Sequence, residues 1–176
     1  MQKFIERLWE LGPQMVSATP HAGELGIKFI AVGIGRATMS MPYNPALIGN
    51  ANTGVVHGGA VTTLLDQAAG LAAMASLNGM APVATLSLRI DYMRAAEKGT
   101  TIIAEAHCYK TTKHVAFIRA LAHNGDEDNP IATAQACFMI TGPVFKIPED
   151  ENGKSDTGKA VDYVYKPSSS QKGGKT

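Results

Sequence analysis

The stretch of residues 60–78 constrains the fold more than any other part of the sequence. It contains no proline, and Gly79 stands at its expected C-terminal end, so the pattern predicts one long helix. Nearly all of its positions carry apolar or small side chains: Leu64, Leu65, Ala68, Ala69, Leu71, Ala72, Ala73, Met74 and Leu77, with Gly70 among them. A helix without a polar face is buried on all sides, so we expect other elements to enclose it.

Strand-like runs dominate the chain after Pro82. The four runs span residues 83–93, 100–109, 116–123 and 131–140, and short polar segments connect them. Short connections favour antiparallel neighbours, because a parallel crossover needs about a dozen residues or more. The order of one strand region, the buried helix and four meandering strands predicts an α+β fold. In this fold, one curved antiparallel sheet wraps around the long central helix.

The N-terminal part of the chain adds a short helix and a further strand region. Residues 2–11 carry apolar side chains at helical spacing, and the Gly-Pro pair that follows is expected to end this helix. Residues 27–41 are rich in β-branched side chains, and two internal glycines indicate a bulge or bend. The turn-rich residues 42–54 predict a loop.

Length and composition favour one globular domain. The chain has 176 residues, and 45% of them are hydrophobic, which suits an ordinary domain with a core. We expect residues 1–24 to form the N-terminal helix and its lead-in, and residues 25–145 to form the main domain. Residues 146–176 turn polar, so we expect a mobile tail there.

Charge says little about partners, and the two cysteines concern only the compartment in which the protein is expected. The net charge is +1 and the 16 Lys and Arg residues are spread thinly, so nothing indicates a nucleic-acid partner. No window reaches the about 18 apolar residues of a membrane span, and the charged N-terminus does not resemble a signal peptide. We therefore expect a cytoplasmic protein in which Cys108 and Cys137 are reduced core residues.

Asp66 is the most informative single residue. A carboxylate surrounded by apolar side chains on a buried helix is costly to ionise, and such groups concentrate at functional sites. A structural role is about equally compatible with the pattern. His57, Gly58 and Gly59 at the start of the helix favour a site, because free N–H groups there suit a carbonyl oxygen or a phosphate.

The spacing between these groups has a geometric consequence. Gly58 and Asp66 are eight positions apart, which corresponds to about 12 Å along a helix axis. One substrate carbonyl cannot contact both groups within a single chain. If they act together, two central helices must meet in antiparallel orientation across a two-fold axis, and the site lies at a dimer interface.

Several spaced motifs resemble one known family. They are the segment NTGVVHGG ending at Gly59, LDQA at residues 65–68, GLAA at 70–73 and SLRIDYMR at 87–94. Together they are similar to the phenylacetic-acid-degradation (PaaI-type) branch of the hotdog-fold acyl-CoA thioesterases, in the 4-hydroxybenzoyl-CoA thioesterase superfamily. The resemblance covers roughly residues 25–142. It implies the hotdog fold, a homodimer that pairs further into a homotetramer, and an acyl-CoA substrate.

The resemblance also implies roles for individual residues. Asp66 would activate a water molecule or attack the thioester itself, and the Gly58 N–H would polarise the carbonyl. His57 would orient groups near the thioester, and Asn50 or Asn52 would position the nucleophile or the substrate. A hydroxyl in the next strand, Thr85, would hydrogen-bond the attacking water.

The resemblance also suggests substrate-binding residues, and the chain differs from the family pattern at one place. Gly59 would lie beside the bound ligand, and Arg94 or Lys113 is a candidate partner for the phosphates of coenzyme A. A solvated surface cation is the slightly favoured interpretation of both. The family usually has proline soon after the tyrosine, where this chain has Ala95 and Ala96.

The sequence therefore predicts hydrolysis of an acyl-CoA to a carboxylic acid and free CoA. No cofactor is expected, because CoA is part of the substrate, and no Cys/His cluster in the sequence indicates a metal. Two alternatives remain: a hotdog hydratase or dehydratase acting on enoyl-CoA or acyl-ACP, and a non-catalytic acyl-CoA-binding domain. The acyl group is not determined by the sequence.

Overall fold

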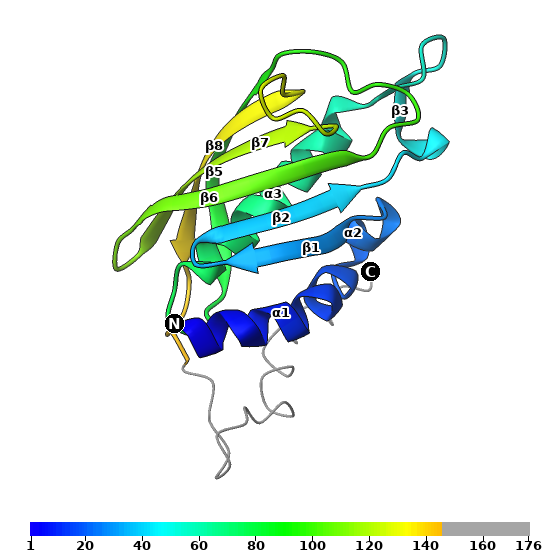
Figure 1. Cartoon of the computed structure of the whole chain (residues 1–176). Coiled ribbons are helices and arrows are strands. Elements are labelled where there is room, and N and C mark those ends of the chain that lie inside the picture. The colour runs from blue at the N-terminus through cyan, green and yellow to red at the C-terminus, as the bar shows by residue number, and fades with distance from the viewer. Residues whose placement is uncertain (146–176) are drawn as a thin grey trace, which may run out of the picture. The chain divides into compact units, whose positions relative to one another are not determined.

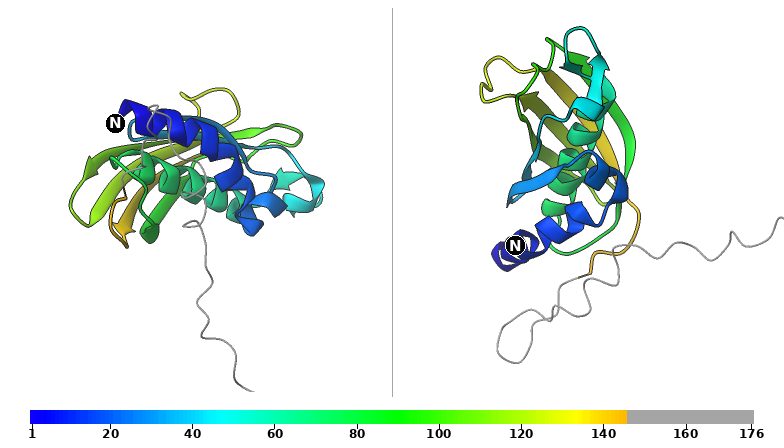
Figure 2. Two further views of the ribbon diagram at one scale, coloured as in Figure 1. Left: turned by 90° about the horizontal axis from the view of Figure 1, so that it is seen from below. Right: turned by 90° about the vertical axis from the view of Figure 1, so that its right-hand side faces the viewer.

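A six-stranded antiparallel sheet and one long helix form the main body of the protein. The computed structural model describes residues 1–145 (Figure 1). The sheet has the strand order β1-β2-β6-β7-β8-β5, and helix α3 (Gly58–Ala75) lies across one face of it, as Figure 2 also shows. The strands are β1 (Lys28–Gly33), β2 (Arg36–Met41), β5 (Val83–Tyr92), β6 (Ile102–Thr111), β7 (Val115–His123) and β8 (Ala132–Ile140). The α+β architecture expected from the sequence is confirmed.

The position of β5 differs from a simple meander. Strands β6, β7 and β8 follow one another as expected, but β5 pairs with β8 and lies at the far edge of the sheet. Residues 93–101 connect β5 to β6, and this segment passes over the end of the sheet (Figure 1). The expectation that this short connection joins neighbouring strands was wrong. A nine-residue segment is long enough to cross the sheet, so the length of the connection did not determine the pairing.

Helix α3 begins two residues earlier and ends three residues earlier than the sequence predicted. Its C-cap is Ser76, and Gly79 lies beyond it, where Met80 forms an isolated bridge with Phe145. The expectation of burial on all sides was also wrong for the single chain. Ten apolar side chains of α3 face the sheet or other elements. One stripe remains partly exposed and consists of Thr62, Thr63, Asp66, Gln67, Gly70 and Met74. We call these six residues the open stripe.

The N-terminal helix α1 (Gln2–Ser17) continues through the Gly-Pro pair that was expected to end it. Pro13 removes one N–H from the helix, but it lies on the exposed side, where water can hydrogen-bond the freed carbonyl. Gly12 has a packing role, because a Cβ added to it would lie 2.4 Å from the ring of Phe29 in β1. Helix α1 thus covers the β1 edge of the sheet, and the short helix α2 (Pro20–Glu24) follows it.

Residues 27–41 form a hairpin of two strands, where the sequence had indicated one interrupted strand. Gly33 pairs with Arg36, so a two-residue turn joins β1 to β2. Gly35 in this turn has a φ of 62°, a conformation that favours glycine. The same residue donates its N–H to the carbonyl of Ala75 at the end of α3. The hairpin is therefore anchored to the central helix.

The segment expected to be a loop, residues 42–54, contains short ordered elements. A 3-10 helix η1 (Pro45–Leu47) precedes strand β3 (Ile48–Asn50), which pairs with β4 (Val55–Val56) in a separate two-stranded sheet. This small ribbon leads directly into α3. It positions the residues that precede the helix.

Three further expectations concern the rest of the chain. Cys108 and Cys137 are both free, although Cys137 is only half-buried. The tail expected at residues 146–176 lies outside the described residues. Among residues 1–145, no helix is long and apolar enough to cross a membrane.

Candidate active site

The start of helix α3 is held by the side chain of His57. This residue is the N-cap, and its Nδ1 accepts a hydrogen bond of 2.9 Å from the N–H of Gly59. The carbonyl of His57 accepts from the N–H of Ala60 at 3.0 Å. Because Nδ1 acts as an acceptor, the neutral imidazole carries its proton on Nε2. His57 is exposed, so this Nε2–H is a donor available to a ligand.

The N–H of Gly58 differs from its neighbours in the first turn. Among residues 1–145, this N–H forms no hydrogen bond, whereas the N–H groups of Gly59 and Ala60 are both hydrogen-bonded. It is the first N–H of an 18-residue helix, where the helix dipole favours negative charge. This group can stabilise an oxyanion.

Asp66 lies on the open stripe of α3, half-buried, and contacts strand β5. The hydroxyl of Thr85 donates a hydrogen bond of 2.9 Å to Asp66 Oδ1. The oxygen of Thr85 remains able to accept, and the second carboxylate oxygen of Asp66 has no partner among the described residues. A water molecule between these two oxygens would donate one hydrogen bond to each. The pair suits the activation of water.

A bulge in β5 brings Thr85 to this position. Its register with β8 shifts between Thr85 and Ser87, so Leu86 is an extra residue. Without the bulge, strict alternation would place Thr85 and Tyr92, seven positions apart, on opposite faces of the sheet. With it, both side chains reach α3, as the hydrogen bonds of each show.

Tyr92 is a site residue that the sequence reasoning placed only within a motif. Its hydroxyl donates a 2.6 Å hydrogen bond to the carbonyl of Gly58 and lies 2.8 Å from the hydroxyl of Thr62. A Cβ on Gly58 would lie 3.2 Å from this hydroxyl, so the close approach favours glycine. Tyr92 thus holds the first turn of α3 against the end of β5. One indication of this role was present in the sequence, because a tyrosine carries a hydroxyl that can hydrogen-bond a neighbouring element.

The two asparagine candidates lie in the ribbon before the helix. Asn50 Oδ1 accepts a 2.9 Å hydrogen bond from the N–H of Asn52, and both side chains are exposed. The neighbouring Gly49 packs on His57, because a Cβ added to it would lie 3.0 Å from the Cα of His57. Asn50 therefore belongs to a turn that contacts the N-cap. No contact joins either asparagine to Asp66.

The two predicted phosphate-binding cations differ in their surroundings. Arg94 is only 20% exposed, and its guanidinium donates to the carbonyl of Asn129 at 3.0 Å and to the side chain of Asn124. It therefore fastens the loop between β7 and β8, and it is not the solvated surface cation that the sequence favoured. Lys113 is exposed in the turn between β6 and β7. Thr111, beside this turn, hydrogen-bonds Ser76 at the C-terminal end of α3.

The predicted site residues therefore form two groups within one chain. His57, Gly58 and Gly59 lie at the N-terminus of α3, and Asp66 with Thr85 lies farther along the helix. Gly58 and Asp66 belong to the same continuous helix, so they are separated by the about 12 Å along its axis that their spacing predicts. One chain brings Asp66 to Thr85 but does not bring Asp66 to the Gly58 N–H.

Comparisons with known proteins indicate the family to which this chain is similar. The thioesterase superfamily pattern matches residues 53–131, which include both groups of site residues. The medium/long-chain acyl-CoA thioesterase YigI of Salmonella typhimurium is 27% identical over 143 residues, covering 74% of this chain and 91% of the relative. A crystal structure of a Pseudomonas aeruginosa protein is 39% identical, covers 75% of this chain and 98% of its own, and has a TM-score of 0.68.

The fold has a further match in a structure of lower identity. The E. coli PaaI protein, from the phenylacetic acid degradation operon, is 21% identical, with a TM-score of 0.69. The match covers 80% of this chain and 97% of that protein, and at this identity it shows a common fold. The match to the superfamily pattern, the relatives and the shared architecture lead to one conclusion: the chain contains a thioesterase superfamily domain, matched at residues 53–131, and has the hotdog fold.

Proposed function

We propose that the protein hydrolyses acyl-CoA thioesters, with Asp66 as the general base. The observation that carries this proposal is the hydrogen bond from Thr85 to Asp66, which leaves the second carboxylate oxygen and the hydroxyl oxygen able to accept hydrogen bonds from a water molecule. The acyl-CoA thioesterase named among the relatives supports the substrate class. The PaaI-type branch remains our prediction from the motifs.

In the proposed reaction, a water molecule donates hydrogen bonds to Asp66 and Thr85. As its oxygen attacks the thioester carbonyl, one proton passes to Asp66 and a tetrahedral oxyanion forms. The oxyanion then collapses, the C–S bond breaks, and the CoA thiolate takes up the proton held by Asp66, which restores the carboxylate. The products are a carboxylic acid and free CoA. No cofactor takes part in these steps.

The oxyanion would be stabilised at the start of α3. The unpaired N–H of Gly58 and the Nε2–H of His57 are the two donors there, since the N–H of Gly59 already serves the N-cap. Removing one donor of this kind typically lowers kcat by about 100- to 1000-fold. Tyr92 would keep the donors in place by holding the first turn of the helix.

We further propose that each site contains residues from two subunits. Strand β5 is a ten-residue edge strand with mostly exposed side chains, and it lies beside the open stripe of α3. Exposed edges of this length are templates for pairing with another strand. A two-fold axis beside β5 would pair it with its copy and set two α3 helices antiparallel. Asp66 of one subunit would then face Gly58 of the other.

The position of the axis follows from the numbering. For residue 66 to face residue 58 of an antiparallel copy, the axis must pass near residue 62, midway between them. Thr62 lies on the open stripe and is half-buried, so it is accessible to such a partner. A homodimer is therefore the smallest active unit in this proposal, and a homotetramer would contain two such dimers.

The first experiment measures thiol release from acyl-CoAs of different chain length by wild type and Asp66→Asn. We expect kcat to fall by about 100- to 10,000-fold in the variant, because it lacks the base but keeps a similar shape. The medium- and long-chain substrates named for the YigI relative are the starting point. Hydration of an enoyl-CoA without thiol release, or binding without turnover, would replace the thioesterase proposal by one of its alternatives.

The second experiment separates the loss of the Gly58 N–H from the addition of a side chain at this position. Proline is well tolerated at the first position of a helix and has no N–H, so Gly58→Pro deletes the proposed donor. Gly58→Ala is the matched control, since it adds a Cβ near Tyr92 but keeps the N–H. We expect a loss of about 100-fold or more in the proline variant relative to the alanine variant. Equal activities would exclude the Gly58 N–H from catalysis.

A third experiment tests whether the site is shared. Asp66→Asn and Gly58→Pro subunits are each inactive as homodimers, but a mixed dimer contains one intact site if the groups come from different chains. Random mixing would restore about a quarter of wild-type activity, because half of the dimers are mixed and each has one of two sites. If the site lay within one chain, no activity would return.

A further inference from the structure

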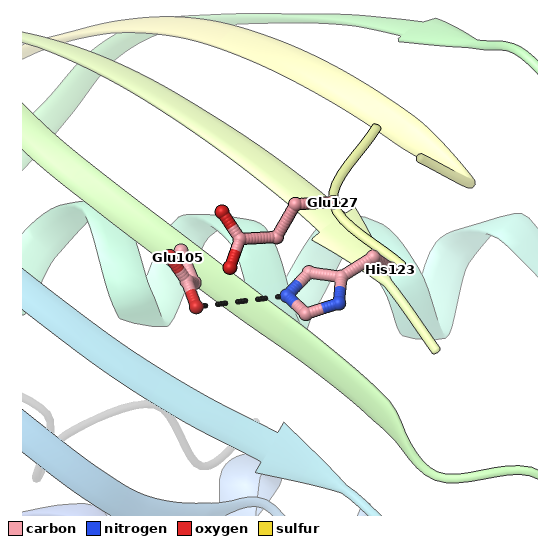
Figure 3. A group of neighbouring side chains, drawn as sticks. All are labelled: Glu105, His123 and Glu127. Atoms are coloured by element: carbon pink, nitrogen blue, oxygen red, sulfur yellow. Dashed lines mark ion pairs between the residues drawn. The ribbon is translucent and has the colours of Figure 1, made fainter. Parts of the chain in front are cut away.

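The outer face of the sheet, opposite α3, carries a second cluster of ionisable groups. Glu105 in β6, His123 at the end of β7 and Glu127 in the following loop offer ligand atoms that all lie within 4.8 Å of one another. Figure 3 shows the imidazole of His123 directed between the two carboxylates. Glu105 and Glu127 also line a cavity of about 460 Å³ on this face. None of these residues belongs to the proposed catalytic site.

His123 indicates that the cluster accommodates a ligand. The residue is only 4% exposed, yet its Nε2 has no hydrogen-bond partner. A buried polar atom without a partner is costly, so its orientation toward the carboxylates requires an explanation. Glu105 Oε1 lies 3.6 Å from this nitrogen, which is too long for a hydrogen bond.

The same distance fits two ligands of one metal ion. Ligand atoms about 2.1 Å from a tetrahedral ion lie about 3.4 Å from each other. The 3.6 Å between His123 Nε2 and Glu105 Oε1 is close to this value. Glu127 lies in a loop, and its side chain is exposed. Within residues 1–145, no arginine or lysine forms an ion pair with either glutamate. A cation between them would relieve their repulsion.

We propose that Glu105, His123 and Glu127 bind a divalent transition-metal ion of the zinc type. Imidazole nitrogen and carboxylate oxygen are both ligands that zinc accepts, and water would complete the coordination. The ion would tie the loop between β7 and β8 to the sheet. Arg94 fastens the other side of this loop through Asn124 and Asn129, so the metal would complete its attachment.

Binding requires a change in the hydrogen bond at Gly125. In the structure, His123 Nδ1 accepts from the Gly125 N–H at 3.1 Å, which places the ring proton on Nε2. When the ion occupies Nε2, the proton must move to Nδ1, and the N–H of Gly125 must turn away. Gly125 is exposed in the loop and has a φ of 112°. A displaced Gly125 amide is therefore a specific signature of the proposed coordination.

The test measures Zn²⁺ binding to the full chain by calorimetry, with Mg²⁺ as the comparison ion. We expect one Zn²⁺ per chain and much weaker Mg²⁺ binding, because imidazole is a poor ligand for magnesium. Glu105→Gln and Glu127→Gln should each lower Zn²⁺ affinity at least about tenfold. Asp128→Asn is the matched control, since it removes the same charge from an exposed residue of the same loop outside the cluster.

Two structural readouts locate the ion. An anomalous difference peak in a Zn²⁺-soaked crystal should lie between the three side chains, and the amide resonance of Gly125 should shift on titration. Equal Zn²⁺ affinity in Glu127→Gln and wild type, equal affinity for Mg²⁺, a peak elsewhere, or no binding up to millimolar Zn²⁺ would each overturn the proposal. None of these measurements depends on thioesterase activity.

Discussion

The two edges of the sheet differ in how they are covered. At the β1 edge, helix α1 packs against the strand, with Gly12 on the ring of Phe29 and Trp9 in edge-to-face contact with the same ring at 5.4 Å. At the β5 edge, no described strand pairs with the outer side of β5, and most of its side chains are exposed. Each edge strand also has a bulge with an exposed apolar residue, Ile30 in β1 and Leu86 in β5.

This difference indicates distinct roles for the two edges. The covered edge is completed within the chain, so its residues contribute to stability. The open edge carries Thr85 and Tyr92, which contact α3 at the proposed site, and it is available for pairing with a second copy. Substitutions at the β5 edge should therefore change association and activity, while those at the β1 edge should change stability alone.

Among substitutions that compare the two edges, the largest effect is expected from a matched pair of lysine substitutions. Leu86 is 52% exposed and Ile30 is 48% exposed, so lysine at either position leaves the folded chain intact. Lysine on an edge strand opposes pairing, and Leu86→Lys should shift the protein to monomer and reduce activity by about 100-fold or more. Ile30→Lys should retain both the dimer and the activity. Light scattering and thiol release measure the two properties, and similar behaviour of both variants would remove the distinction between the edges.

A smaller loss is expected from Thr85→Val, which removes the hydroxyl but keeps the shape. Hydrogen bonds to charged groups contribute about 1.5–3 kcal/mol, so kcat should fall by roughly 10- to 150-fold. The dimer should persist, because only one hydroxyl is lost. Thr85→Ser is the control that restores the donor, and its failure to recover activity would argue against positioning of water by this group.

Tyr92→Phe should have a weaker effect on catalysis. It removes the hydrogen bond to the Gly58 carbonyl, and a neutral hydrogen bond of about 0.5–1.5 kcal/mol corresponds to a roughly 2- to 13-fold decrease in kcat. A positioning role predicts that kcat changes more than KM. A change in KM alone would instead place Tyr92 in substrate binding.

The smallest effect on activity is expected at the covered edge. Gly12→Ala places a Cβ against the Phe29 ring, and such overpacking costs about 1–3 kcal/mol of unfolding free energy. The activity of the folded protein should stay unchanged, because α1 contributes nothing to the proposed site. Urea unfolding and thiol release at low temperature provide the two measurements. Lost activity without lost stability would connect the β1 edge to catalysis.

Local patterns in the sequence were sufficient for most of the secondary structure. The apolar run at residues 60–78 predicted the central helix, and four later runs predicted strands within about two residues of their observed ends. Local reasoning failed where a residue acts through a distant partner. Gly12 was interpreted as the end of a helix, but its partner is Phe29 in the next strand. Arg94 was interpreted as a surface cation, but it fastens a loop 30 positions later in the chain.

The candidate site shows the same division. The sequence indicated the helix start at His57 and Gly58, Asp66 and the separation between them, because these depend on one continuous helix. The hydrogen bond between Asp66 and Thr85 depends on the bulge at Leu86, which sets the face on which Thr85 lies. The cluster of Glu105, His123 and Glu127 could not be seen at all, because β6, β7 and their loop bring together residues that have no recognisable spacing.

By itself, the sequence determined which segments are helix and strand and where the residues of the proposed site lie along them. It did so because apolar periodicity and chain geometry are local properties. Only the tertiary structure decided that β5 lies at an open edge and that one stripe of α3 faces outward. The entropic cost of closing a loop rises only slowly with the number of residues in it. The length of a connection therefore discriminates poorly between possible strand orders. The packing of the whole sheet against the helix therefore determines the order.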